Sequence, residues 1–111
     1  MIPDFQLIML PLLESLKNGD EYDIKQIHDV LGKHFELTDN ELDELLPDLE
    51  QTRFYNNLSH AKRHLMVAGL IEHITEDRFK ITSLGKQVLC RQLNIIDTDY
   101  LRRLPGYIES I

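Results

Sequence analysis

The chain has 111 residues, 42% of them hydrophobic and 28% charged, and a formal net charge of −7. This length suits one domain, and the single cysteine, Cys90, excludes an internal disulfide framework and any multi-cysteine zinc site. No apolar run reaches the roughly 18 residues of a membrane span, and the start MIPDFQ lacks the basic segment of a secretory signal. We therefore expect one cytoplasmic domain that does not enter a membrane.

The negative charge is unevenly distributed along the chain. Residues 1–50 hold thirteen acids and three bases, a net of −10, whereas residues 51–111 hold six acids and nine bases, a net of +3. The stretch from Gln51 to Ile71 contains three bases and no acid. Such an asymmetry of sign indicates contact with a polyanion.

The first predicted helix begins at Asp4, with Pro3 at or near its first position. Its inner stripe is formed by Phe5, Ile8, Met9, Leu12 and Leu16. Pro11 lies in the middle, where a proline costs about 3 kcal/mol unless the helix kinks. Leu7 and Leu10 fall on the far face, and we expect the C-terminal segment to cover them.

Two further helices follow before residue 50. Asp23 caps the first of them, with Gln26 three residues further on. Thr38 and Glu41 form the capping box of a short acidic helix, and Pro47 ends it.

A longer helix is predicted over residues 52–68, with Gly69 closing it. Its inner face carries Phe54, Leu58, Ala61 and Leu65. Residues 70–74 and 78–81 then predict two short strands joined by a turn. A further helix is capped by Thr82 or Ser83, and a last short helix is capped by Thr98 and ended by Pro105-Gly106.

This order of elements predicts a mainly α fold with a small β-hairpin: a winged helix-turn-helix with an extra short helix and a C-terminal helical extension. We expect residues 1–94 to form the winged-helix domain. Residues 95–111 would be the extension, which either packs on the first helix or links to a further domain.

The outer face of the helix 52–68 suits DNA recognition, because it carries hydrogen-bond donors and no acid. On a wheel of about 100° per residue this face holds Arg53, Asn56, His60, Arg63 and Val67, with Asn57 and His64 on one flank. Arginine reads guanine and asparagine reads adenine in the major groove, and an acid-free face does not repel phosphates. We expect Lys62, Lys80 and Lys86 to contact phosphates. The alternative is a solvated face that lacks acids by chance.

The hairpin is the expected wing, but its turn carries Glu76-Asp77, which phosphates would repel. Only Arg78 and Lys80 favour DNA contact there, so a purely structural hairpin stays open as an alternative.

We expect no catalysis, metal or cofactor. Pro3-Asp4 and Asp23-Ile24-Lys25 formally match a loose nuclease pattern, but both acids are predicted to cap helices, whereas that site needs acids on adjacent strands. His60 and His64 could bind a metal as an i, i+4 pair, although no third ligand is evident. Cys90 is expected to be a core or half-buried thiol. The acids of residues 36–50 lack the spacing of a calcium-binding loop.

Several stretches together resemble the amino-terminal domain of Mrr-type restriction endonucleases. They are Ile2-Pro3-Asp4, Met9-Leu10-Pro11-Leu12-Leu13, Glu44-Leu45-Leu46-Pro47, Arg53-Phe54-Tyr55-Asn56-Asn57, Ala61-Lys62, Leu65, Ala68-Gly69-Leu70-Ile71 and Ile81-Thr82-x-x-Gly85, followed by Ile96-Asp97 through Leu101 and Leu104-Pro105-Gly106-Tyr107. The resemblance implies a winged-helix DNA-recognition domain that is normally fused to a C-terminal nuclease domain acting on modified DNA. The matching Arg53, Asn56, Asn57 and Lys62 lie on or beside the outer face of the helix 52–68.

We therefore expect a module of a Mrr-like restriction system that binds duplex DNA through the major groove, recognises a sequence or a modification, and lacks the catalytic domain. Its partners would be DNA and either a second copy or a C-terminal nuclease domain. The alternative function is a winged-helix protein-interaction or dimerisation domain without DNA contact.

Overall fold

The computed structural model describes residues 2–45, 51–104 and 107. The helices are α1 (Phe5–Ser15), α2 (Ile24–His34), α3 (Asp39–Asp43), α4 (Arg53–Val67), α5 (Ser83–Leu89) and α6 (Thr98–Leu101), and the strands are β1 (Ile71–His73) and β2 (Phe79–Ile81). This architecture confirms the predicted fold class, a mainly helical, winged-helix-like fold with a small hairpin. The predicted helix-ending residues Pro47 and Pro105-Gly106 lie outside the described residues.

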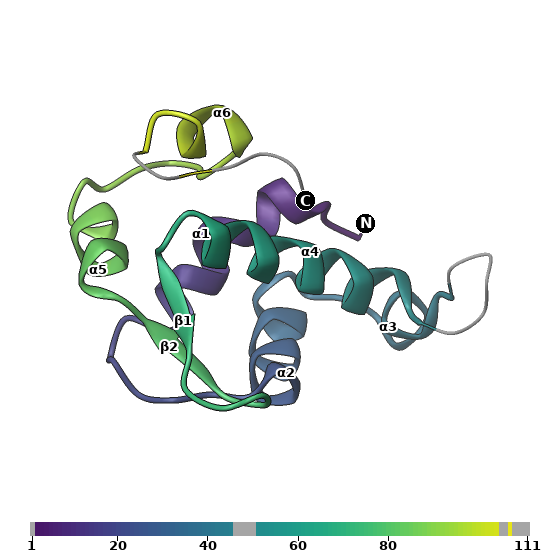
Figure 1. The fold of residues 1–111 in the computed structure, drawn as a ribbon. Coiled ribbons are helices and arrows are strands. Elements are labelled where there is room, and N and C mark those ends of the chain that lie inside the picture. Colours follow the sequence, from purple (N-terminus) through teal and green to yellow (C-terminus); the bar gives the residue numbers. More distant parts are fainter. Residues whose placement is uncertain (1, 46–50, 105–106, 108–111) are drawn as a thin grey trace.

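The core forms where α1 and α4 pack against each other, with the hairpin and α5 on one side and α3 on the other (Figure 1). The side chains that α4 buries are the predicted inner face: Phe54, Leu58, Ala61 and Leu65. From α1 the buried side chains are Ile8, Met9, Leu12 and Leu13. Removing these side chains from water is the main force that fixes the outward face of α4.

The helix α1 starts one residue later than predicted, because Asp4 is its N-cap and accepts a hydrogen bond from the backbone N–H of Leu7 at 3.0 Å. The helix continues through Pro11, whose carbonyl accepts a hydrogen bond from Ser15 Oγ at 2.9 Å. Leu10 packs partly against the core, but Leu7 is 43% exposed, so the expected cover over Leu7 is wrong.

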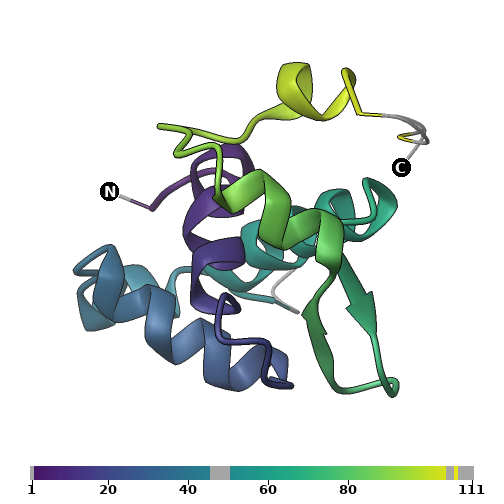
Figure 2. The same ribbon diagram turned by 90° about the vertical axis from the view of Figure 1, so that its left-hand side faces the viewer.

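The hairpin extends from the end of α4 as an arm beside the helices (Figure 2). Its strands pair antiparallel, with Ile71 opposite Ile81. An unpredicted bridge extends this sheet, because Tyr22 and Phe79 exchange two backbone hydrogen bonds of 2.9 Å. A single bridging residue has no alternating pattern, so periodicity could not reveal it.

Thr82 is the N-cap of α5, and its hydroxyl accepts a hydrogen bond from Gly85 N–H at 3.0 Å and donates to the Gly69 carbonyl at 2.6 Å. The left-handed φ of +79° at Gly69 ends α4, as predicted. Cys90 is the C-cap of α5 and is exposed, so the expected core or half-buried thiol is wrong.

The extension after α5 contacts α1. Asp97, rather than the predicted Thr98, caps α6, because its carboxylate accepts a hydrogen bond from Tyr100 N–H at 2.9 Å. Thr98 instead donates its N–H and its hydroxyl to Gln6 Oε1, both at 3.3 Å, while Ile96 is fully buried. The division of the chain at residue 95 stays a prediction. In the described part of the chain, no helix combines the length and the apolar character needed to cross a membrane.

Candidate nucleic-acid interface

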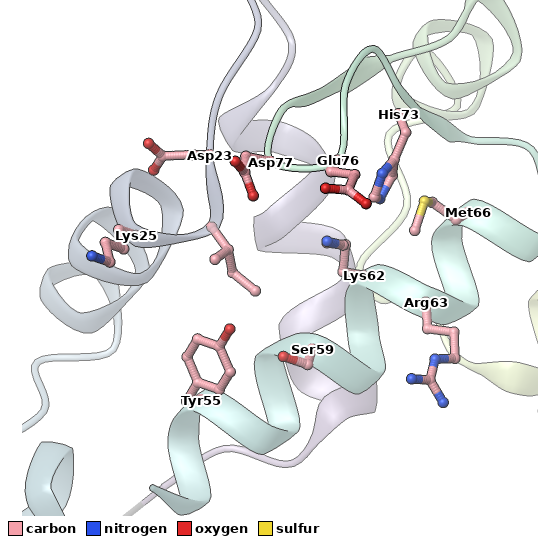
Figure 3. Close-up of a pocket in the computed structure, with 11 residues that line it drawn as sticks. Asp23, Lys25, Tyr55, Ser59, Lys62, Arg63, Met66, His73, Glu76 and Asp77 are labelled. Carbon is pink, nitrogen blue, oxygen red and sulfur yellow. The ribbon is translucent and has the colours of Figure 1, made fainter. Parts of the chain in front are cut away.

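A groove of about 630 Å³ separates α4 from the N-terminus of α2 and the hairpin tip, which we define as residues 74–78 (Figure 3). It is lined by Asp23, Ile24, Lys25, Tyr55, Ser59, Lys62, Arg63, Met66, His73, Glu76 and Asp77. These residues come from three separate segments of the chain, which only the folded core brings together.

One wall of the groove is a flank of α4. Tyr55, Ser59, Lys62 and Met66 recur at helical spacing, and Arg63 stands at the edge of the same wall. The hydroxyl of Thr52 fixes where this helix begins, because it accepts a hydrogen bond from Tyr55 N–H at 3.1 Å. The wall thus offers two cations and two hydroxyl groups and has no acid.

Lys62 is the most constrained cation of this wall. Its Nζ atom lies 5.0 Å from the centroid of the Phe79 ring, at the base of the hairpin. Burial lowers the pKa of Lys62 below its ordinary value of 10.5, and the neighbouring charge of Arg63 lowers it further. An anion bound in the groove would offset both effects and favour the charged ammonium.

The other walls carry charges of both signs. Lys25 and Asp23 come from the start of α2, and the Asp23 carboxylate caps that helix by accepting a hydrogen bond from Gln26 N–H at 2.8 Å. The hairpin contributes His73, Glu76 and Asp77. Among the described residues that line the groove, three cations therefore face three carboxylates.

The predicted contact residues near the start of α4 lie beside this groove. Arg53 is exposed and pairs with Glu44, with 2.6 Å between Nε and Oε2, and its backbone N–H donates to the Glu44 carbonyl at 2.8 Å. A base contact by Arg53 would have to replace that ion pair. Asn56 is half-buried and lies two turns before Arg63 on the same ridge of α4.

The opposite flank of α4 packs against the chain termini instead of lining the groove. Asn57 Nδ2 donates a hydrogen bond to the Pro3 carbonyl at 3.0 Å. His64 stacks on Phe5, with 4.7 Å between ring centroids, and its Nδ1 lies 2.8 Å from Tyr107 Oη. His60 is exposed, with its ring centroid 5.9 Å from that of Phe5.

The predicted contact residues therefore divide into separate groups. Lys62 and Arg63 lie in the groove, Arg53 and Asn56 lie towards the start of α4, and Asn57, His60 and His64 form the flank that faces the termini. Lys80 lies on β2, opposite Glu72 of β1, and does not line the groove. The DNA-contact role of all eight residues stays a prediction.

Four polar groove residues are not among the contact residues predicted from the sequence: Lys25, Tyr55, Ser59 and His73. Tyr55 and Ser59 could have been found, because they precede Lys62 at helical spacing. No sequence pattern places Lys25 and His73 beside α4, since their approach to that helix depends on how α2 and the hairpin pack.

The residues of the loose nuclease pattern act as helix caps. Asp4 caps α1 and Asp23 caps α2. Within residues 2–45, 51–104 and 107, no group of three or more His, Cys, Asp or Glu side chains could hold a metal ion.

A family model described as the Mrr N-terminal domain matches residues 5–91. The matched range includes α1 to α5 and therefore all walls of the groove. No curated protein and no solved structure matches the chain significantly.

Proposed function

The chain belongs to the Mrr N-terminal domain family, and from this membership we propose that it is the duplex-DNA recognition module of a Mrr-like restriction system. The observation that carries the proposal is the acid-free flank of α4, which lines a groove with Lys62, Arg63 and two hydroxyl groups. Cationic and hydroxyl side chains are the usual partners of DNA phosphates.

In the proposed complex, the ridge of α4 enters the major groove. Arg63 and Asn56 face the base edges, where arginine donates to guanine and asparagine pairs with adenine. Lys62 and Lys25 lie on either side of a backbone strand in the groove and contact its phosphates. The module recognises a base sequence or a modification, and a separate nuclease domain cleaves the DNA.

Replacing Arg63 by alanine tests this arrangement. Loss of a base-contacting arginine costs about 1–3 kcal/mol of binding free energy, so the variant should bind a labelled mixed-sequence duplex about fivefold to 150-fold more weakly than the wild type. Fluorescence anisotropy at low salt measures the change. Arg103→Ala is the matched control, because Arg103 is also exposed and does not line the groove.

The salt dependence distinguishes a groove contact from general attraction. Lys25→Gln should reduce the slope of log affinity against log salt concentration by about one unit, because one phosphate contact is lost. Equal losses in Arg63→Ala and Arg103→Ala, or an unchanged affinity in Arg63→Ala, would refute this interface.

The exposure of two large apolar residues favours a second candidate function, protein interaction or dimerisation. Leu7 on α1 and Ile95 before α6 are each 43% exposed, and the Gln6–Thr98 hydrogen bonds bring their segments together. A concentration-dependent dimer in sedimentation equilibrium, combined with no duplex binding at low salt, would favour this function over DNA recognition.

A further inference from the structure

The hairpin tip presents carboxylates to the groove, while the neighbouring basic residue Arg78 is engaged elsewhere. Glu76 and Asp77 are exposed and line the groove opposite α4. Arg78 instead pairs with Glu21 in the segment before α2, with 3.4 Å between Nε and Oε1, and donates to its carbonyl at 3.2 Å.

Several contacts hold the tip in this orientation. The backbone N–H of Ile74 donates to the Arg78 carbonyl at 2.9 Å and closes the turn. The next residue, Phe79, makes the two-bond bridge with Tyr22 and lies beneath the ammonium of Lys62. The carboxylates therefore stand on a turn that is anchored both to the segment before α2 and to α4.

The two carboxylates share the groove with the cations expected to contact DNA. Figure 3 shows Glu76 and Lys62 pointing into the space between the hairpin tip and α4. A phosphate held by Lys62 and Lys25 would lie in the field of Glu76 and Asp77, and like charges across a groove repel. The same carboxylates also attract the lysine when no DNA is bound.

We infer that Glu76 and Asp77 are affinity-setting residues, which restrain the groove from holding DNA through its phosphates alone. This inference rests on the proposed function. Contacts to phosphates supply sequence-independent affinity, whereas contacts to base edges supply recognition. Carboxylates beside the phosphate site reduce the affinity that comes from phosphate contacts. Stable binding therefore requires the base contacts of α4 as well. Repulsive groups are a general means of suppressing unwanted partners.

The double variant Glu76→Gln/Asp77→Asn tests the inference, because it keeps the side-chain shapes and removes both charges. Its affinity for a labelled mixed-sequence duplex at low salt should rise by about fivefold to tenfold, as expected for two unit charges acting across a water-filled groove. The gain should shrink at high salt, where charges are screened. Thermal unfolding of the variant should match the wild type, since both residues are exposed.

The matched control is Glu14→Gln/Glu36→Gln. It changes the net charge by the same amount at two exposed residues that do not line the groove. We expect the control to alter the affinity by less than about twofold, because neither residue lines the groove and salt screens charges more strongly as their distance grows.

The outcomes separate this inference from the proposed function. If Arg63→Ala weakens duplex binding but Glu76→Gln/Asp77→Asn gains no more than the control, the restraint is refuted and the interface stands. If neither the wild type nor the Glu76→Gln/Asp77→Asn variant binds duplex at low salt, both the restraint and the proposed function are refuted.

Discussion

Replacing Gly85 by alanine should destabilise the fold, because α5 approaches the base of the hairpin too closely for a side chain. A Cβ atom at this position would lie 2.2 Å from the Leu70 carbonyl oxygen and 2.6 Å from Ile81 Cγ1. Carbon–oxygen contacts are ordinarily about 3.3–3.6 Å long. The helix would therefore have to move away from the strands by about 1 Å, since the nearest obstacle is backbone.

The cost follows from the contacts that this displacement would strain. Overpacking of a tight site costs about 1–3 kcal/mol or somewhat more, and the hydrogen bond of 3.0 Å from Thr82 N–H to the Leu70 carbonyl lies in the path of the movement. The higher helix propensity of alanine offsets this cost by up to about 1 kcal/mol. We expect a net loss of about 1–2 kcal/mol, which corresponds to a melting temperature roughly 5–10 °C lower for a chain of this size.

Thermal unfolding followed by far-ultraviolet circular dichroism measures this loss. Gly32→Ala is the matched control, because Gly32 lies inside α2 and, among the residues that the structure describes, a Cβ there would meet only Leu42 Cδ2, at 3.4 Å. That variant should be as stable as the wild type or slightly more stable, since alanine favours helix. A Gly85→Ala protein that melts with the wild type would show that α5 and the hairpin are not locked together in this way.

Two further substitutions test the flank and the wall of α4. Asn57→Ala should lower the free energy of unfolding by about 1 kcal/mol, because the hydrogen bond to the Pro3 carbonyl is lost. Urea unfolding measures this loss. A loss of duplex affinity at unchanged stability would instead assign Asn57 to DNA contact. Lys62→Gln removes a lysine whose pKa is lowered by burial and by Arg63. Between that lowered pKa and 10.5, the unfolded chain binds more protons than the folded one, so the wild type should gain stability relative to Lys62→Gln as the pH rises towards 10.5. Urea unfolding at neutral and alkaline pH measures this gain, and parallel pH profiles of the two proteins would contradict it.

The sequence by itself determined the features that depend on near neighbours. The capping box of Asp23 and Gln26 closes over three residues of chain, with hydrogen bonds of 2.8 and 2.9 Å, so its residue types suffice to predict it. The inner face of α4 follows from the 3.6-residue period, and the left-handed glycine at position 69 marks where that helix ends. Fold class and family resemblance rest on the same local patterns.

The smaller errors at element ends arise where two neighbouring residues both suit the same local role. Asp97 and Thr98 are both good N-caps, and the sequence does not say which of them adopts the extended backbone of a cap. In the structure Thr98 is held by Gln6, a residue 92 positions away, and Asp97 takes the cap. The contact with Gln6 thus accompanies the cap at Asp97 rather than at Thr98.

Only the tertiary structure decided which neighbours the outer residues of α4 would meet. A helical wheel gives the direction of a side chain but not what packs beside it. Asn57 and His64 were therefore predicted to contact DNA. In the structure, Asn57 donates a hydrogen bond to the carbonyl of Pro3, 54 positions away, and the His64 ring lies within hydrogen-bond distance of the Tyr107 hydroxyl, 43 positions away. The groove depends in the same way on distant segments, because its walls come from α2, α4 and the hairpin. Burial of the shared apolar core fixes how these elements pack, and the hydrophobic periodicity of the sequence does not predict that arrangement.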